Sequence, residues 1–278
     1  MFDFHLHSKR SDGQLTPLEL ARHLAGLNVQ AFAITDHNYL SADLLAVRDF
    51  AARRQIGFVF GLEISSVDRL TDTSLHMLGY GNNLCFERLN QALQPVRDGY
   101  NRRAKNIIDM LNRKYPAIKL DYDRLLTESE SSYLDRNRIA SALQQYKKDS
   151  STIKELLPEV FVVESDDWLP DTAEVIKLII ACGGYPVLAH PGRLMSRDPS
   201  AFERLIDRLA TVGLYGLEAY YQSHSAEQRQ TLCVMAANNE LPVTGGSDWH
   251  GPEFSPGKNP GCLLPEQIAQ TLLATFSN

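Results

Sequence analysis

Two histidines near the start of the chain have the spacing of a metal-binding pair. An alternating apolar pattern over residues 2–6 predicts a short strand, on which His5 and His7 point to the same face. Asp12 and Gly13 follow as a turn that adds a carboxylate. Such a pair is also common as ordinary surface or core decoration, so a metal site requires further ligands elsewhere in the chain.

Further candidate ligands stand at the ends of the other predicted strands. These strands cover residues 31–35, 57–64, 75–80, 185–190, 214–219 and 241–244. The polar residues at or beyond their ends are Asp36, His37, Glu63, His76, His190, Asp248 and His250. Buried imidazoles and carboxylates are costly unless they are paired or metal-bound. The whole set therefore favours a metal centre over a purely structural role.

The elements that carry these residues alternate between strands and helices. Capping patterns start helices at Thr16, Asp171 and Ser225. The alternation predicts a parallel α/β sheet, and convergence of the polar residues favours a closed barrel over an open doubly wound sheet. Residues 81–170 lack strand patterns and predict an inserted helical lid subdomain. The barrel domain would then comprise residues 1–80 and 171–278.

The ligand types restrict the metal. The candidates offer nitrogen and oxygen without any thiolate, which suits Mn, Fe or Zn better than Ca. They are too many for one coordination shell, so a centre of two or three divalent ions is expected. Such a centre can activate water as a hydroxide and clamp a phosphate.

The composition excludes several other functions. The chain has 278 residues, 44% hydrophobic and 22% charged, and its net charge of −6 argues against a protein that coats DNA. No apolar run is long enough to span a membrane, and no export signal opens the chain. Four scattered cysteines without a Cys-x-x-Cys pair suggest reduced thiols, so a cytoplasmic location is expected. Glycine-rich phosphate loops and a serine-nucleophile elbow are missing, and the oligomeric state stays open.

The motifs resemble those of the polymerase and histidinol phosphatase (PHP) family. That family has a distorted (β/α)7 barrel, holds a trinuclear metal centre and hydrolyses phosphoesters. The matching segments are His5-x-His7 with Asp12-Gly13, Thr35-Asp36-His37, Gly61-Leu62-Glu63, His76, Ala189-His190-Pro191 and Gly246-Ser247-Asp248-x-His250.

The resemblance implies a division of the ligands among three metals. The first would be held by His5, His7, Glu63 and Asp248. Glu63 would bridge to a second metal held by His76 and His190. Asp12, His37 and His250 would hold the third. From its chemistry, we expect Asp36 to orient one of the imidazoles instead of binding a metal.

The helical insertion and the segment around Glu218 resemble a nucleotide-specific branch of the family. This implies hydrolysis of phosphate monoesters of nucleotides, first the 3′-phosphate of nucleoside 3′,5′-bisphosphates, by a metal-activated hydroxide. A 5′-to-3′ exoribonuclease acting on short 5′-phosphorylated RNA is the alternative, and a non-catalytic metal-bearing binding module is a third. Where the branch has an Arg-x-His signature, this chain has Arg136-Asn137-Arg138.

Substrate contacts and proton transfer are assigned more loosely. Four arginines are candidates to bind phosphate groups: Arg102, Arg103, Arg136 and Arg193. Each could instead be a solvated surface charge. His224 is a candidate substrate contact, and either His224 or Asp248 could pass a proton to the leaving oxygen.

Overall fold

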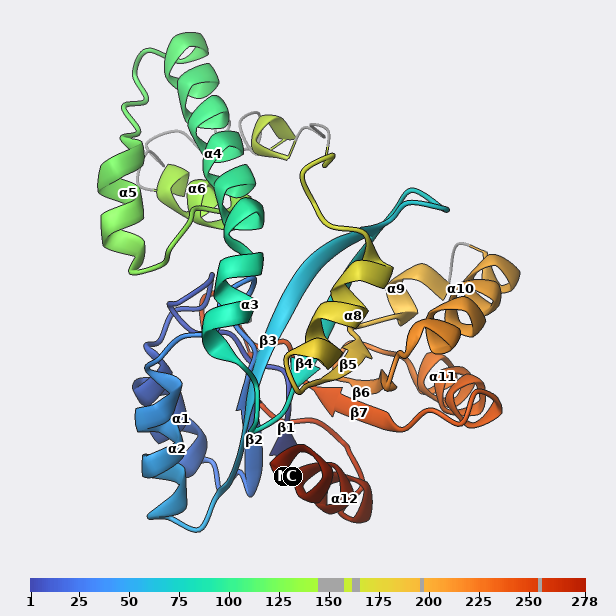
Figure 1. The fold of residues 1–278 in the computed structure, drawn as a ribbon. Helices are drawn as coiled ribbons and strands as arrows, with labels where there is room; N and C mark the ends of the chain where they lie inside the picture. Colours follow the sequence, from blue (N-terminus) through green and yellow to red (C-terminus); the bar gives the residue numbers. More distant parts are fainter. Residues whose placement is uncertain (145–157, 162–165, 196–197, 255–256) are drawn as a thin grey trace.

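The computed structural model describes residues 1–144, 158–161, 166–195, 198–254 and 257–278. Among these residues seven strands form one sheet, in which each strand pairs with the next along the chain (Figure 1). The strands are β1 (Phe2–Asp3), β2 (Ala31–Ile34), β3 (Gly57–Asp68), β4 (Thr73–Tyr80), β5 (Tyr185–Leu188), β6 (Gly216–Tyr221) and β7 (Val243–Gly246). The helices are α1 (Pro17–Gly26), α2 (Leu44–Ala52), α3 (Phe86–Ala92), α4 (Gln94–Lys114), α5 (Tyr122–Ser129), α6 (Arg136–Leu143), α8 (Thr172–Ala181), α9 (Gly192–Met195), α10 (Pro199–Val212), α11 (Ala226–Asn238) and α12 (Glu266–Ser277).

One strand departs from the predicted parallel sheet. β4 runs antiparallel to both β3 and β5, whereas the other neighbouring pairs are parallel. The reason is local, since β3 and β4 are joined directly through residues 69–72 without a crossover helix. His76 was expected at the far end of its strand, but it lies near the start of β4. Because β4 is reversed, that start lies at the same rim as the far ends of the parallel strands.

The first and last strands close the sheet into a distorted barrel. Phe4 N donates to Gly245 O over 3.1 Å, and Asp248 N donates to His5 O over 2.9 Å. Gly246 permits this approach, because a Cβ atom there would lie 2.2 Å from the Cβ of His5. The predicted fold class, a distorted (β/α)7 barrel with helices around it, is confirmed.

The two ends of the barrel interior differ in chemistry. Alternate residues of a strand share a face, so Val59 and Glu63 point the same way from β3, as do Leu78 and His76 from β4. Val59 and Leu78 belong to an apolar cluster that fills one end. Glu63 extends past the end of β2, because β2 stops opposite Phe60 and β3 continues to Asp68. β3 and β4 therefore carry apolar residues at one end of this face and ligand-type residues at the other.

The apolar end is closed by the last helix, α12. Phe276 of this helix is fully buried, and its ring stacks on Tyr80 with centroids 4.8 Å apart. Tyr185 and Tyr215 contact the same ring at 5.4 and 5.8 Å. The Tyr80 hydroxyl donates to Phe4 O over 2.7 Å, so the buried phenol is satisfied.

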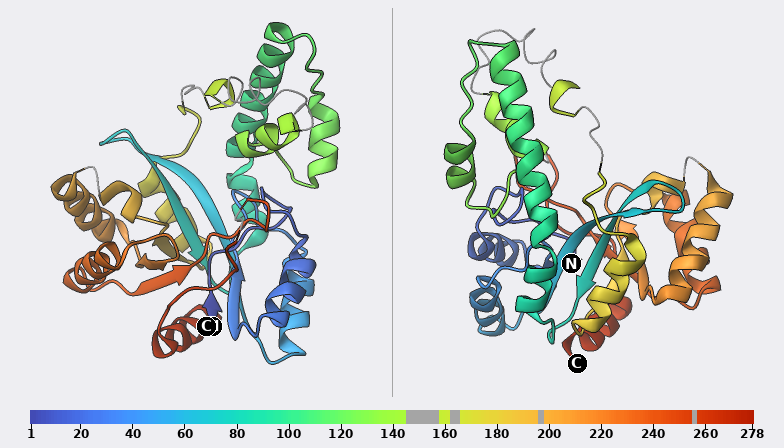
Figure 2. Two further views of the ribbon diagram at one scale, coloured as in Figure 1. Left: turned by 180° about the vertical axis from the view of Figure 1, so that it is seen from behind. Right: turned by 45° about the horizontal axis from the view of Figure 1, so that its top comes forward.

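The helices between β4 and α8 extend away from the barrel, on the side opposite α12 (Figures 1 and 2). Leu89 and Val96 still belong to the main core, whereas Ile107 and Leu111, further along α4, join a separate core with residues of α5 and α6. The lid subdomain proposed for residues 81–170 stays a prediction, and residues 145–157 and 162–165 of that range lie outside the described residues. None of the described helices is long and apolar enough to cross a membrane.

Candidate metal centre

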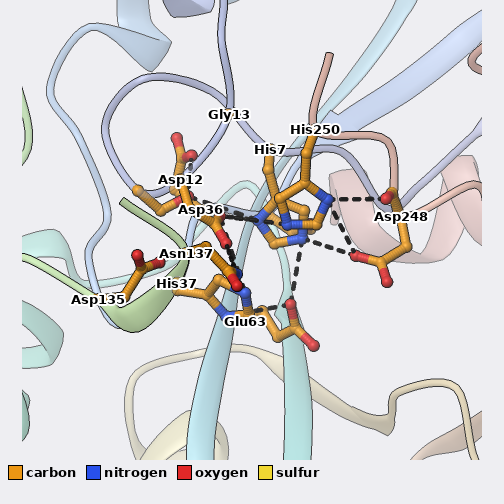
Figure 3. A network of polar contacts seen from close by, with 12 residues as sticks. His7, Asp12, Gly13, Asp36, His37, Glu63, Asp135, Asn137, Asp248 and His250 are labelled. Atoms are coloured by element: carbon orange, nitrogen blue, oxygen red, sulfur yellow. Dashed lines mark hydrogen bonds and ion pairs between the residues drawn. The ribbon is translucent and has the colours of Figure 1, made fainter. Parts of the chain in front are cut away.

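Four ligand-type side chains meet at the polar rim of the barrel, and Figure 3 shows three of them, His7, Glu63 and Asp248. The Nε2 atoms of His5 and His7 lie 3.1 and 3.2 Å from Glu63 Oε2. The same nitrogens lie 3.5 and 3.1 Å from Asp248 Oδ1. This group matches the set that the family resemblance implies for the first metal.

Glu63 also takes part in a second group through its other oxygen. Its Oε1 lies 2.8 Å from His76 Nδ1 and 3.1 Å from His190 Nε2. The two oxygens of this fully buried carboxylate thus face different sets of imidazoles. That is the geometry required of a residue that bridges two cations.

A third group gathers around Asp12. Its Oδ1 lies 3.2 Å from His250 Nε2, 3.8 Å from His7 Nδ1 and 4.0 Å from His37 Nε2. The Nδ1 atom of His37 lies 3.2 Å from Glu63 Oε2, so this imidazole stands between Asp12 and Glu63. The structure thus brings all nine predicted ligands into one cluster, while their division among metals stays a proposal.

The donor set fits divalent cations. Three buried polar atoms in the cluster, His7 Nε2, Asp12 Oδ1 and His37 Nδ1, have no hydrogen-bond partner. Hydrogen bonds therefore do not explain why His7 Nε2 and His37 Nδ1 each lie 3.2 Å from Glu63 Oε2, or why Asp12 Oδ1 lies 3.2 Å from His250 Nε2. Ligand atoms about 2.1 Å from one ion and at about 90–110° to each other lie about 3.0–3.4 Å apart, close to the separations found here. A bound cation would satisfy the orphaned atoms.

Burial and neighbouring charges shift the pKa values of the groups in the cluster. Burial raises the pKa of Glu63, but the surrounding imidazoles, led by His37, hold it well below its usual range. Burial lowers the pKa of His37 to about 3. Burial likewise disfavours charged His5, but the carboxylates of Glu218 and Glu63 hold its pKa well above the usual value. His5 therefore carries a proton that a cation would displace on binding.

Two of these ligands have a left-handed backbone conformation. His190 has φ 34° and Asp248 has φ 56°, values that place non-glycine residues in the left-handed region. Both residues follow the end of a strand and face the cluster. Strain of this kind persists only where the surroundings enforce it, and it is frequent at functional sites.

Sequence reasoning missed the most important supporting residue, Glu218. This carboxylate is fully buried in β6, with Oε1 2.8 Å from His5 Nδ1. Its Oε2 accepts a hydrogen bond from His190 N over 2.7 Å. A carboxylate behind a metal-binding imidazole fixes the tautomer and orientation of the ring. The available signal was a lone acidic residue within an apolar strand.

Asp36, which we expected to orient an imidazole, reaches one only through Ser11. Its oxygens accept hydrogen bonds from Ser8 N, Ser8 Oγ and Ser11 Oγ at 2.6–2.7 Å. The Ser11 hydroxyl lies 3.5 Å from His7 Nδ1, so any effect on the ring is indirect. Asp36 mainly holds the loop that carries Asp12.

The structure also places the candidate substrate contacts. Arg193 lies at the rim of the cluster, where its Nη2 donates to the Tyr221 hydroxyl over 2.7 Å. The hydroxyl in turn donates to Asp248 Oδ2 over 3.1 Å. Arg103 and Arg136 line a cavity beside the cluster, whereas Arg102 is exposed on α4 and is not among the residues that line it.

The contacts of the His224 ring argue against its predicted role in proton transfer. Its Nε2 accepts a hydrogen bond from Gly192 N over 3.1 Å, and its Nδ1 lies 3.0 Å from Ala219 O. A proton on Nε2 would face the Gly192 N–H, and burial lowers the pKa of the ring. Both nitrogens are thus committed to the backbone, which argues against His224 as the acid.

Comparison with known proteins agrees with this geometry. Residues 3–213 match the PHP domain family. The chain belongs to that family. The predicted recognition and the predicted class of metal-dependent phosphoester hydrolase are thereby confirmed. The identity and number of the metals, by contrast, rest on the cluster alone.

Relatives within the family carry several related activities. A 3′,5′-nucleoside bisphosphate phosphatase of Chromobacterium violaceum is 31% identical over 257 residues, covering 90% of this chain and 87% of the relative. A phosphoribosyl 1,2-cyclic phosphate 1,2-diphosphodiesterase of Eggerthella lenta is 29% identical, covering 90% and 94%. The 5′-3′ exoribonuclease Rnm of Escherichia coli is 26% identical, covering 91% and 86%.

Two solved structures share the fold over the whole chain. A protein of Bifidobacterium adolescentis assigned as a metal-dependent phosphoesterase superimposes with a TM-score of 0.80 at 27% identity, covering 100% of this chain and 96% of that one. A Chromobacterium violaceum protein named as an amidohydrolase, with bound sulfate and no metal, gives a TM-score of 0.81 at 28% identity, covering 99% and 96%.

Proposed function

We propose that the protein hydrolyses phosphate monoesters of small nucleotides, first of all the 3′-phosphate of nucleoside 3′,5′-bisphosphates. A cavity of about 270 Å³ carries this proposal. Asp12, His37 and His76 of the cluster form one part of its wall, and Tyr100 and Tyr133 of the inserted segment form another. A phosphate could thus reach the cluster while a base stacks on an aromatic ring.

In this proposal the cluster holds two or three divalent ions, with Mn²⁺ as the first choice. When bound, such ions neutralise phosphate charge and lower the pKa of an attacking water. The proposed division among them follows the three groups described above: His5, His7, Glu63 and Asp248; Glu63, His76 and His190; Asp12, His37 and His250.

Phosphate binding and proton transfer would depend on Arg193 and Asp248. Arg193, held by the Tyr221 hydroxyl, would bind the phosphate oxygens by charge-assisted hydrogen bonds. Burial raises the pKa of Asp248, but His5 and His7 outweigh it and hold the pKa well below the usual range. Asp248 would therefore be ionised, as a metal ligand must be, and it stays our candidate to pass a proton from the attacking water to the leaving oxygen.

The substituents beyond the reacting phosphate would lie in the cavity. Arg136 lines it beside Asp135, and Arg103 lines it while ion-paired with Asp166 and lying 4.8 Å from the Trp168 ring centroid. Both guanidinium groups are therefore candidates to bind the second phosphate.

A substrate panel tests the proposal. The Mn²⁺-loaded protein is assayed with adenosine 3′,5′-bisphosphate, a 5′-phosphorylated triribonucleotide and a ribose 1,2-cyclic phosphate. We expect phosphate release from the bisphosphate with a kcat/KM at least tenfold above the other two. A preference for the triribonucleotide, with successive release of nucleotides, would make the exoribonuclease the function. Bound metal without turnover of any ester would favour the third alternative, a non-catalytic metal-bearing binding module.

A further inference from the structure

The loop at residues 8–13, which carries Asp12, is held from two sides. One side is the barrel, and the other is the inserted segment. On the barrel side, Asp36 binds Ser8 and Ser11 through the three hydrogen bonds described above. On the other side the loop meets residues 130–138 of the inserted segment, which comprise the connection from α5 to α6 and the first turn of α6.

The inserted segment holds the loop on both sides of Asp12. The Arg138 guanidinium donates from Nη2 to Ser11 O over 3.0 Å and to Gly13 O over 2.9 Å. These carbonyls flank Asp12 in the chain. Ser131 Oγ adds a hydrogen bond to Arg10 O over 3.0 Å. The backbone around Asp12 is thus fixed by donors from the insertion.

Asn137 acts on the Asp12 carboxylate itself (Figure 3). Its Nδ2 donates to Asp12 Oδ2 over 3.1 Å. The other oxygen, Oδ1, is the buried atom without a hydrogen-bond partner that faces His250 and His37. Asn137 therefore selects which oxygen of Asp12 is presented to the imidazoles.

Among the described residues, the insertion contacts the third group of ligands but not the first. Tyr133 Oη donates to His37 O over 3.2 Å, which brings a second ligand of the same group under its control. By contrast, His5 and Asp248 bind Glu218 and Tyr221, which both belong to β6 of the barrel.

We propose that Asn137 and Arg138 are positioning residues for the third metal, and that docking of residues 130–138 is thermodynamically coupled to its binding. The inference rests on the three-metal centre proposed above. Coupling of this kind is reciprocal, so the ion must hold the docked segment as strongly as the segment favours the ion. Movement of the insertion away from the cavity would weaken the third site while the barrel keeps the other two.

Metal titration of the full-length protein tests this proposal. Mn²⁺ binding is followed by calorimetry, and bound ions are counted by native mass spectrometry, for the unmodified protein, Asn137→Ala and Arg138→Ala. We expect the weakest of three ions to lose about 10- to 100-fold in affinity in either variant, as for other residues that orient a ligand, with the other two unchanged. Asn137→Asp should weaken it further, since it replaces the donor with a like charge.

A matched control separates this effect from damage to the insertion. Asn112 holds Leu120 through two backbone hydrogen bonds inside the insertion, at 2.8 and 3.0 Å. Asn112→Ala should leave all three affinities within about twofold of the unmodified protein. Third-ion affinity within twofold in both Asn137→Ala and Arg138→Ala would overturn the proposal. Fewer than three ions in the unmodified protein would instead refute the three-metal centre.

A second readout needs no variant. Adding Mn²⁺ to the metal-free protein should slow amide hydrogen exchange in residues 130–138, because binding of the third ion stabilises the docked segment. Three bound ions with unchanged exchange in this segment would overturn the coupling.

Discussion

The two ends of the barrel use the same strands for opposite purposes. At the α12 end, the strand faces are apolar and pack around Phe276. At the other end, the same faces of β3 and β4 present Glu63 and His76. The difference shows how stability and chemistry are separated along each strand. The apolar end can supply folding energy that the buried charges of the other end cannot.

The largest effect should come from removing a ligand at the polar end. We expect His7→Ala to lower kcat on the order of a thousandfold, because electrostatic stabilisation by metals contributes several kcal/mol to such reactions. It should also lower the number of bound ions, while the midpoint of thermal unfolding of the metal-free protein is kept. Activity near that of the unmodified protein would overturn the assignment of the centre.

The matching change at the apolar end should show the reverse. Phe276→Ala removes a fully buried ring, so the free energy of unfolding should fall by about 3–5 kcal/mol in urea titrations. Metal content of the folded fraction should not change. Gln270→Ala, at an exposed position of the same helix, is the control and should stay within about 0.5 kcal/mol. Loss of metal with little loss of stability would contradict the separation of the two ends.

Glu218 lies at the polar end but is not itself a proposed ligand, so a smaller effect is expected. Glu218→Gln keeps an oxygen to accept from His190 N but turns an amide group towards His5 Nδ1. Mn²⁺ affinity should fall by about 10- to 100-fold with the stoichiometry retained at saturation. Calorimetric titration measures both quantities, and an unchanged affinity would show that His5 needs no carboxylate behind it.

The smallest effect should come from Tyr221→Phe, at the edge of the cluster. The substitution removes the hydroxyl that tethers Arg193 to Asp248 and keeps the ring. Loss of these two hydrogen bonds leaves Arg193 less well positioned, so KM should rise by about three- to tenfold, with kcat changed less. Steady-state kinetics on the best substrate of the panel distinguish the two constants. A fall in kcat alone would assign Tyr221 to the chemical step instead.

The cluster could be predicted because its residues can be recognised from their neighbours in the sequence. His37, His190 and Asp248 each follow an apolar run that reads as a strand, so a barrel brings them together by its topology. Glu218 could not be assigned a role in this way, since its function depends on how β6 lies beside β5. The direction of β4 could not be predicted either. Only the short connection at residues 69–72 distinguishes a hairpin from a crossover.

The roles of single polar side chains were the least predictable feature. His224 has the chemistry of a proton donor, but backbone partners occupy both of its nitrogens. Arg138 reads as a surface charge of a helix, yet it binds two carbonyls of a loop 125 and 127 positions away. Such roles follow from the docking of distant segments, which residue type and spacing do not determine.

Closure of the barrel has a consequence for the order of synthesis. Ser247 N donates to Asp3 over 2.9 Å, and these two residues are 244 positions apart in the chain. The strand that starts the sheet is therefore without its final neighbour until β7 has left the ribosome. Contacts of such long sequence separation form late in folding. An unfinished chain thus carries the first two histidines but cannot assemble a hydrolytic centre.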